Sequence, residues 1–162
     1  MYYLLTLVTL LTTALMSGLF FTWSNAIMPG LKKLPAFESL LAMQSFNKSI
    51  LNPWFLTAFL LPVILLPLKA VFVYKQGLQL KLFLLVLAML LYFLGVFMVT
   101  IVINVPINEG LNKIDLQQLS MQELIRQKDI FQTKWVFFNT IRAICATLSF
   151  LLLIVTVIDK DV

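Results

Sequence analysis

Four apolar runs, each long enough to cross a bilayer, alternate with shorter polar segments along the chain. The runs cover residues 3–24, 53–74, 80–103 and 134–158. A membrane-spanning helix needs about 20 predominantly apolar residues, so each run predicts one transmembrane helix. The linker between the second and third runs is very short, which makes these two helices antiparallel neighbours. The pattern therefore predicts an all-α fold, a bundle of four transmembrane helices that forms a single integral membrane domain over residues 1–162.

Two segments between the runs have a mixed polar and apolar pattern. Residues 36–51 intersperse apolar side chains with polar ones, which predicts an amphipathic helix at the membrane surface or across one end of the bundle. Gln44 and Asn47, three residues apart in this segment, either point into the mouth of the bundle or belong to a solvated face. Residues 111–132 carry charges of both signs between leucines and isoleucines. They predict a polar helical segment that leads into the fourth span.

Two prolines mark the expected ends of the first and third membrane helices. Pro29 and Gly30 follow the first run, and Pro106 follows the third run inside a cluster of asparagines. Proline lacks the backbone N–H and clashes with the preceding turn, so it commonly ends a helix. Because successive spans point in opposite directions, the segments after the first and third spans are expected at the same end of the bundle.

The composition places the chain among membrane proteins and removes several kinds of chemistry. Hydrophobic residues make up 61% of the chain and charged residues 12%, which is roughly half the charged share of soluble domains. There is no histidine and only one cysteine. Without histidine, paired cysteines or clustered acidic residues in the apolar runs, no haem, zinc, copper or non-haem iron site can be identified. We therefore expect neither a metal nor another cofactor.

The basic residues are interpreted as membrane anchors. The formal net charge is +5, but the twelve lysines and arginines are scattered at the ends of the apolar runs. Nucleic-acid binding requires a clustered basic patch, so nucleic acid is excluded as a partner. The candidate partners are membrane lipids, a small hydrophobic or anionic ligand and a second copy of the chain. The expected location is the plasma membrane, the inner membrane in bacteria; the basic linker at 75–79 favours cytoplasmic termini, although the other loops hold more lysine and arginine.

An arginine and an asparagine interrupt the fourth apolar run. Trp135, Asn139 and Arg142 recur at spacings of three and four, and Ala146 and Ser149 continue the series on the same helical face. A charged side chain in the middle of a spanning helix costs at least about 2 kcal/mol, so it usually faces a bundle interior or a wet cavity. We therefore predict that this face of the helix points into the bundle.

The predicted topology brings further polar and aromatic residues to the same end of the bundle. The candidates for a pocket lining are Trp135, Asn104, Pro106, Asn47, Gln44, Trp54, Ser24 and Pro29. The candidates for a chemical role are Arg142, Asn139, Asn108 and Glu109. Arg142 has no acidic partner within the apolar runs. Its counter-charge is therefore a cage of amides and carbonyls, water in a cavity, or an anionic ligand such as a phenolate, an enolate, a carboxylate or a lipid phosphate.

Three hypotheses for the function follow from this arginine. In the first, Arg142, Asn139 and Asn108 form a purely structural clamp between the fourth and third spans. In the second, the pocket binds a lipid or another hydrophobic anion. In the third, the protein oxidises a small phenolic or quinone-like molecule without a metal, because a fixed cation favours an enolate that can itself pass an electron to dioxygen. Glu109 is then the only candidate base near the proposed pocket.

Four segments, in order along nearly the whole chain, resemble the successive motifs of the anthrone oxygenase-like family. They are residues 18–31, residues 42–47, residues 105–111 and the pair Lys134-Trp135 followed by Asn139 and Arg142. The resemblance implies a small four-helix membrane protein. It also implies that some relatives oxidise anthrones to anthraquinones without a cofactor, whereas most bacterial members have no assigned activity. Lys134 replaces the arginine expected before the tryptophan, which keeps the charge but loses the planar guanidinium.

Overall fold

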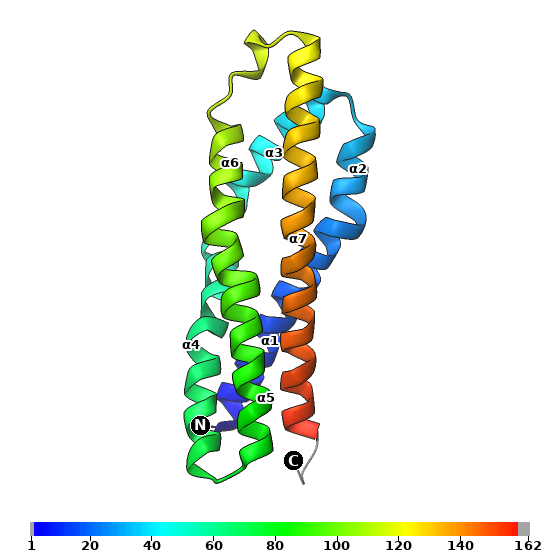
Figure 1. Cartoon of the computed structure of the whole chain (residues 1–162). Helices are drawn as coiled ribbons and strands as arrows, with labels where there is room; N and C mark the ends of the chain where they lie inside the picture. Colours follow the sequence, from blue (N-terminus) through cyan, green and yellow to red (C-terminus); the bar gives the residue numbers. More distant parts are fainter. Residues whose placement is uncertain (1, 159–162) are drawn as a thin grey trace.

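The computed structural model describes residues 2–158, and almost all of them are helical (Figure 1). Four helical rods are long and apolar enough to cross a membrane: Tyr2–Lys33, Pro53–Lys75, Gln79–Asn112 and Met121–Ile158. Within residues 2–158 there is no β-strand. The predicted all-α bundle of four transmembrane helices is therefore confirmed.

The first and third rods change helix type along their length, because each contains π-helical turns between α-helices. In chain order the elements are α1 (Tyr2–Thr22), the π turn η1 (Trp23–Ile27), α2 (Met28–Lys33), α3 (Ala36–Ser49), α4 (Pro53–Lys75), α5 (Gln79–Leu90), the π segments η2 (Leu91–Met98) and η3 (Thr100–Asn104), α6 (Val105–Asn112), the 3₁₀ turn η4 (Leu116–Gln118) and α7 (Met121–Ile158). The first rod is thus α1–η1–α2, and the third is α5–η2–η3–α6.

The four rods form a closed arrangement in which α1 and α5 each pack against both α4 and α7. Figure 1 shows the beginning of α1 and the end of α7 at the same end of the bundle. At the opposite end, α3 lies across the bundle and contacts α6 and α7. The amphipathic pattern of residues 36–51 therefore corresponds to a helix that covers one end of the bundle.

Pro29 and Pro106 do not end their helices, and this corrects the sequence prediction. The first rod continues through Pro29 to Lys33, and the third rod continues through Pro106 to Asn112. Each proline is the second residue of a new α-helix that directly follows a π-helical turn. The first turn of a helix tolerates proline, because its backbone N–H would have no regular partner there. Where each rod changes from π to α spacing, a new α-helix begins, and its first turn can hold a proline although the rod continues.

The fourth rod begins well before the membrane. Its 38 residues form a helix about 57 Å long, nearly twice the hydrocarbon thickness of a bilayer. Its first turn is fixed by a capping box, in which the Ser120 N–H donates to Glu123 Oε2 at 2.9 Å and the Glu123 N–H donates to Ser120 Oγ at 3.3 Å. The polar helical segment predicted before the fourth span is therefore partly the first turns of α7 itself.

In the apolar half of the bundle, Gly95 of the third rod lies directly against Cys145 of the fourth rod. A Cβ atom placed on Gly95 would lie 2.6 Å from the Cβ of Cys145 and would also overlap its Sγ. Protein interiors are packed too tightly to absorb such an overlap without a backbone shift. Glycine at this position therefore permits the close contact between η2 and α7.

We expect Gly95→Ala to destabilise the protein by about 1–3 kcal/mol, the usual cost of overpacking a core. Thermal unfolding in detergent micelles measures the effect. Gly18→Ala is the matched control, because a Cβ on Gly18 would have no other atom within 4 Å, and its Tm should not fall. Adding Cys145→Gly to Gly95→Ala should recover part of the loss. Equal Tm values for the two alanine variants would contradict the close contact.

Candidate functional site

The face of α7 that was predicted to point inward is buried. Trp135 and Arg142 are 4% and 5% exposed, and Asn139, Ala146 and Ser149 are 0% exposed. These five residues follow the three- and four-residue spacing of one helical face. The guanidinium, the indole and the amide therefore all lie inside the bundle.

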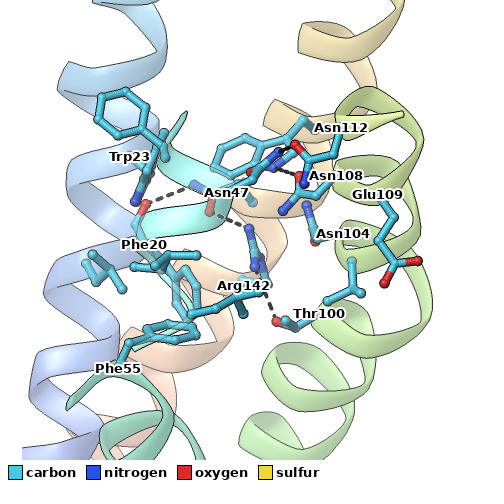
Figure 2. Close-up of a pocket in the computed structure, with 17 residues that line it drawn as sticks. Phe20, Trp23, Asn47, Phe55, Thr100, Asn104, Asn108, Glu109, Asn112 and Arg142 are labelled. Carbon is cyan, nitrogen blue, oxygen red and sulfur yellow. Dashed lines mark hydrogen bonds between the residues drawn. The ribbon is translucent and has the colours of Figure 1, made fainter. Parts of the chain in front are cut away.

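Arg142 lines a cavity of about 130 Å³ beneath α3, shown in Figure 2. Its walls combine aromatic rings and amides from all four rods and from α3. The aromatic lining residues are Phe20, Trp23, Phe46, Phe55 and Trp135. The polar lining residues, besides Arg142, are Asn47, Thr100, Asn104, Asn108, Glu109, Asn112 and Asn139. Such a small cavity with aromatic walls and a few convergent polar groups has the usual composition of a ligand site.

Arg142 uses only part of its hydrogen-bonding capacity within the protein. Its Nη1 donates to Thr100 Oγ1 at 3.2 Å, and its Nη2 donates to Asn139 Oδ1 at 2.9 Å. Its Nε has no partner among the described residues. The guanidinium carbon lies 4.6 Å from the ring centre of Phe20 and 5.4 Å from that of Trp135, which provides cation–π attraction. The positive charge therefore has aromatic and neutral polar neighbours but no acidic hydrogen-bond partner in the described chain.

Two of the amides predicted to surround Arg142 connect different pairs of rods. Asn139 Nδ2 donates to the Phe20 carbonyl at 2.9 Å and to Ser24 Oγ at 2.8 Å, so it joins α7 to the first rod. Asn108 Oδ1 accepts a hydrogen bond from Trp135 Nε1 at 2.9 Å, so it joins α6 to α7. The clamp hypothesis placed both asparagines between the fourth and third spans. The structure supports that placement for Asn108 and corrects it for Asn139.

Asn104 lines the cavity without any hydrogen-bond partner for its side chain. The residue is 1% exposed, and neither its Oδ1 nor its Nδ2 has a partner among the described residues. Buried polar groups in native proteins are nearly always hydrogen-bonded, to water or a ligand if not to the protein. The Asn104 amide is therefore a buried polar group whose hydrogen-bonding capacity the described residues leave unused.

The two predicted site residues of α3, Gln44 and Asn47, turn towards the bundle rather than towards solvent. Asn47 is 6% exposed, and its Nδ2 donates to Asn112 Oδ1 at 3.3 Å, which ties α3 to α6 above the cavity. Gln44 Nε2 donates to the carbonyls of Leu111 and Ile114, both at 2.9 Å. Gln44 therefore satisfies backbone groups at the end of α6, and it does not line the cavity.

Four predicted site residues lie away from the guanidinium. Trp54 is 87% exposed because the next residue of α4 turns into the cavity, and neighbouring helical residues point in different directions. Pro106 is exposed on α6, and Pro29 lines a separate groove between α2 and α7. Glu109 is exposed at the edge of the cavity, and Figure 2 shows its carboxyl group pointing away from Arg142. Glu109 is thus not placed as a base beside the guanidinium.

Sequence reasoning missed several residues that line the cavity, among them Phe20, Trp23 and Thr100. Phe20 and Thr100 contact the Arg142 guanidinium directly. A signal for two of them was present, since Phe20 lies four residues before Ser24, and Thr100 lies four residues before Asn104. Residues four apart share a helical face. The helical faces that carry the predicted residues Ser24 and Asn104 therefore also carry Phe20 and Thr100.

One protein family matches the chain. The family model described as anthrone oxygenase matches residues 43–152, which is more than half of the chain and runs from α3 into the last turns of α7. No curated protein and no solved structure gives a significant match. The matched residues contribute Asn104, Asn108 and Arg142 to the cavity. The chain belongs to the anthrone oxygenase family.

Proposed function

We propose that the protein binds a small aromatic molecule with an ionisable oxygen in the Arg142 cavity and oxidises it with dioxygen, without a metal. The observation that carries the proposal is the buried guanidinium, which has an unpartnered Nε in a cavity with aromatic walls. A phenolate or enolate oxygen would accept a charge-assisted hydrogen bond from it. The name of the family, anthrone oxygenase, is consistent with an enolisable aromatic substrate.

The buried cation would favour the deprotonated form of such a ligand. At a separation of about 4 Å, two opposite charges attract by about 4 kcal/mol at an effective dielectric constant near 20, against about 1 kcal/mol in water. The difference of about 3 kcal/mol corresponds to more than a hundredfold shift of the ionisation equilibrium. The aromatic walls would stack on the ring at the same time.

Dioxygen can oxidise the bound anion directly. For an anthrone-like substrate, a CH₂ group conjugated to a carbonyl loses a proton to water, and the resulting enolate passes one electron to dioxygen. The carbon radical and superoxide combine into a peroxide, which takes up a proton and loses water to leave a second carbonyl group. The net reaction converts CH₂ and O₂ into C=O and H₂O, so no external reductant is needed. Arg142 would stabilise the negative charge on the enolate oxygen.

The volume of the cavity limits what it can enclose. At about 130 Å³, it is similar to an engineered cavity of roughly 150 Å³ that binds benzene in another protein. One aromatic ring therefore fits inside. Leu51 and Glu109 line the cavity and are both exposed, so a larger substrate would extend between them towards the surface.

Oxygen uptake by the purified protein in detergent micelles tests the proposal. We expect dioxygen to be consumed in step with product formation for at least one anthrone, phenol or hydroquinone in a broad panel. Dialysis against EDTA should leave the rate unchanged, because the proposed reaction uses no metal. An uptake rate that EDTA abolishes, or no uptake with any compound, would contradict the proposed reaction.

Binding without oxidation is the second candidate function. The position of Glu109 favours it, because no carboxylate within residues 2–158 is hydrogen-bonded to the guanidinium, where it could remove a proton from a ligand. Mass spectrometry of the gently extracted protein distinguishes the two. A co-purifying anionic lipid or quinone, together with no oxygen uptake, would support a binding role alone.

A further inference from the structure

We infer that Asn104 selects ligands that carry a hydrogen-bond donor next to the ionised oxygen, as the monoanion of a catechol does. This inference rests on the proposed function, since it concerns the molecule that occupies the Arg142 cavity. It adds a substrate class, a single aromatic ring with two adjacent oxygens, and it names the residue that reads the second oxygen.

The unsatisfied groups of the cavity define the chemistry of its occupant. Asn104 offers one amide oxygen and one NH₂ group, both without partners, and the residue is 1% exposed. The Nε of Arg142 is likewise unpartnered. Both residues line the same cavity, and Figure 2 shows their side chains pointing towards the same space. An occupant that reaches these groups would supply an acceptor for the N–H groups and a donor for the amide oxygen.

Each of the other four asparagines in the lining has at least one hydrogen-bond partner within the protein. Asn47 is bonded to Asn112, Asn108 accepts from an indole, and Asn139 donates to the first rod. Among the described lining residues, Asn104 is the one asparagine whose donor and acceptor are both unpartnered. Selectivity for a second polar group on the ligand is therefore expected to depend on this residue.

A catechol monoanion matches this set of groups, whereas a simple phenolate does not. Its oxyanion can accept from Arg142 Nε and from the Asn104 NH₂ group, while the adjacent hydroxyl donates to the Asn104 oxygen. A phenolate would leave the buried amide oxygen unpaired, which typically weakens binding by about tenfold or more. Because an amide presents its donor and acceptor side by side, it is suited to two adjacent oxygens on one ring.

Dissociation constants for catechol, 2-methoxyphenol and phenol test the inference. The wild-type protein in detergent micelles should bind catechol about tenfold or more tightly than either of the other two, because both lack the second hydroxyl donor. Asn104→Leu should reduce this preference to near the intrinsic ratio set by the acidity of the ligands. Comparing the preference between variants cancels that intrinsic ratio. Asn104→Asp, which keeps an acceptor but repels an anion, should weaken the binding of all three.

Asn25→Leu is the matched control, because it makes the same substitution at an exposed position of η1 that does not line the cavity. This variant should keep the preference for catechol. If phenol and catechol bind the wild type equally, or if the preference survives in Asn104→Leu, the inference is wrong while the proposed function stands. If none of the three binds, the proposed pocket for aromatic oxyanions fails as well.

Discussion

Replacing Arg142 with methionine should weaken the binding of an aromatic oxyanion at least about 30-fold and abolish oxygen uptake. Truncating one partner of a buried, hydrogen-bonded charge pair typically costs about 2–5 kcal/mol, and about 2 kcal/mol corresponds to about 30-fold. Methionine has a similar length and is apolar, so it fills the space without supplying a charge. Titration with catechol and oxygen-uptake assays in detergent micelles measure the two effects.

The same variant should keep its fold. An unpaired buried cation is expensive, and replacing buried charges with apolar groups is often neutral or stabilising. Thr100 Oγ1, which loses the guanidinium, still donates to the Val96 carbonyl at 2.7 Å. Asn139 Oδ1 also loses it, but the Asn139 side chain keeps its two hydrogen bonds to the first rod. Lys134→Met is the matched control, because it removes a positive charge from an exposed position on the same helix. A fall in Tm by many degrees with unchanged ligand binding would instead indicate a structural clamp and sink the proposed function.

Asn139→Leu should lower the stability of the protein, whereas Arg142→Met should not. Its side chain accepts from Arg142 and donates to the Phe20 carbonyl and to Ser24, so three hydrogen bonds disappear. The two bonds to the first rod contribute about 0.6 kcal/mol each, and the loss of the third leaves a buried Arg142 N–H unpaired, which costs about 1 kcal/mol more. The expected loss is therefore about 2 kcal/mol. Unfolding by a denaturing detergent measures it. Thr140→Val is the control, because Thr140 is exposed and bonds only within its own helix, and its stability should not change.

The two substitutions together would assign different roles to adjacent residues of one helical face. If Asn139→Leu unfolds as easily as the wild type, the hydrogen bonds between α7 and the first rod are not what holds these helices together. If it is destabilised while Arg142→Met is not, the structural contribution comes from the asparagine and the ligand contribution from the arginine. The hydrophobic pattern alone treats both as polar interruptions of one span.

The helices and the buried face of α7 could be predicted because both depend on local spacing. Runs of about 20 apolar residues indicate spans, and recurrence at three and four residues indicates one face. The prolines were misread for the same reason. Pro29 and Pro106 resemble helix ends locally, but each follows a π turn. Whether a rod continues past such a point depends on its packing against other rods, which local spacing does not report.

The composition of the cavity was predicted less well, because its contacts join distant parts of the chain. Trp54 and Phe55 are adjacent aromatic residues at the start of α4, and either could have faced inward. The bond between Trp135 and Asn108 spans 27 residues of sequence. Local pattern placed such residues at the same end of the bundle, but it could not decide which pairs would satisfy each other and which, like Asn104, would be left over.

Because a π turn lies on each side of the cavity, a single-residue deletion could change the cavity lining without changing the apolar half of the bundle. Each holds one residue more than the α-helical turn it replaces, so losing a single codon from η3 would rotate the rest of its rod by about 100°. That rotation would carry Asn108 and Glu109 off the cavity wall. Because α5 precedes the deletion, it would keep its packing against α4 and α7. Homologues with and without such a codon would then share one bundle but not one chemistry.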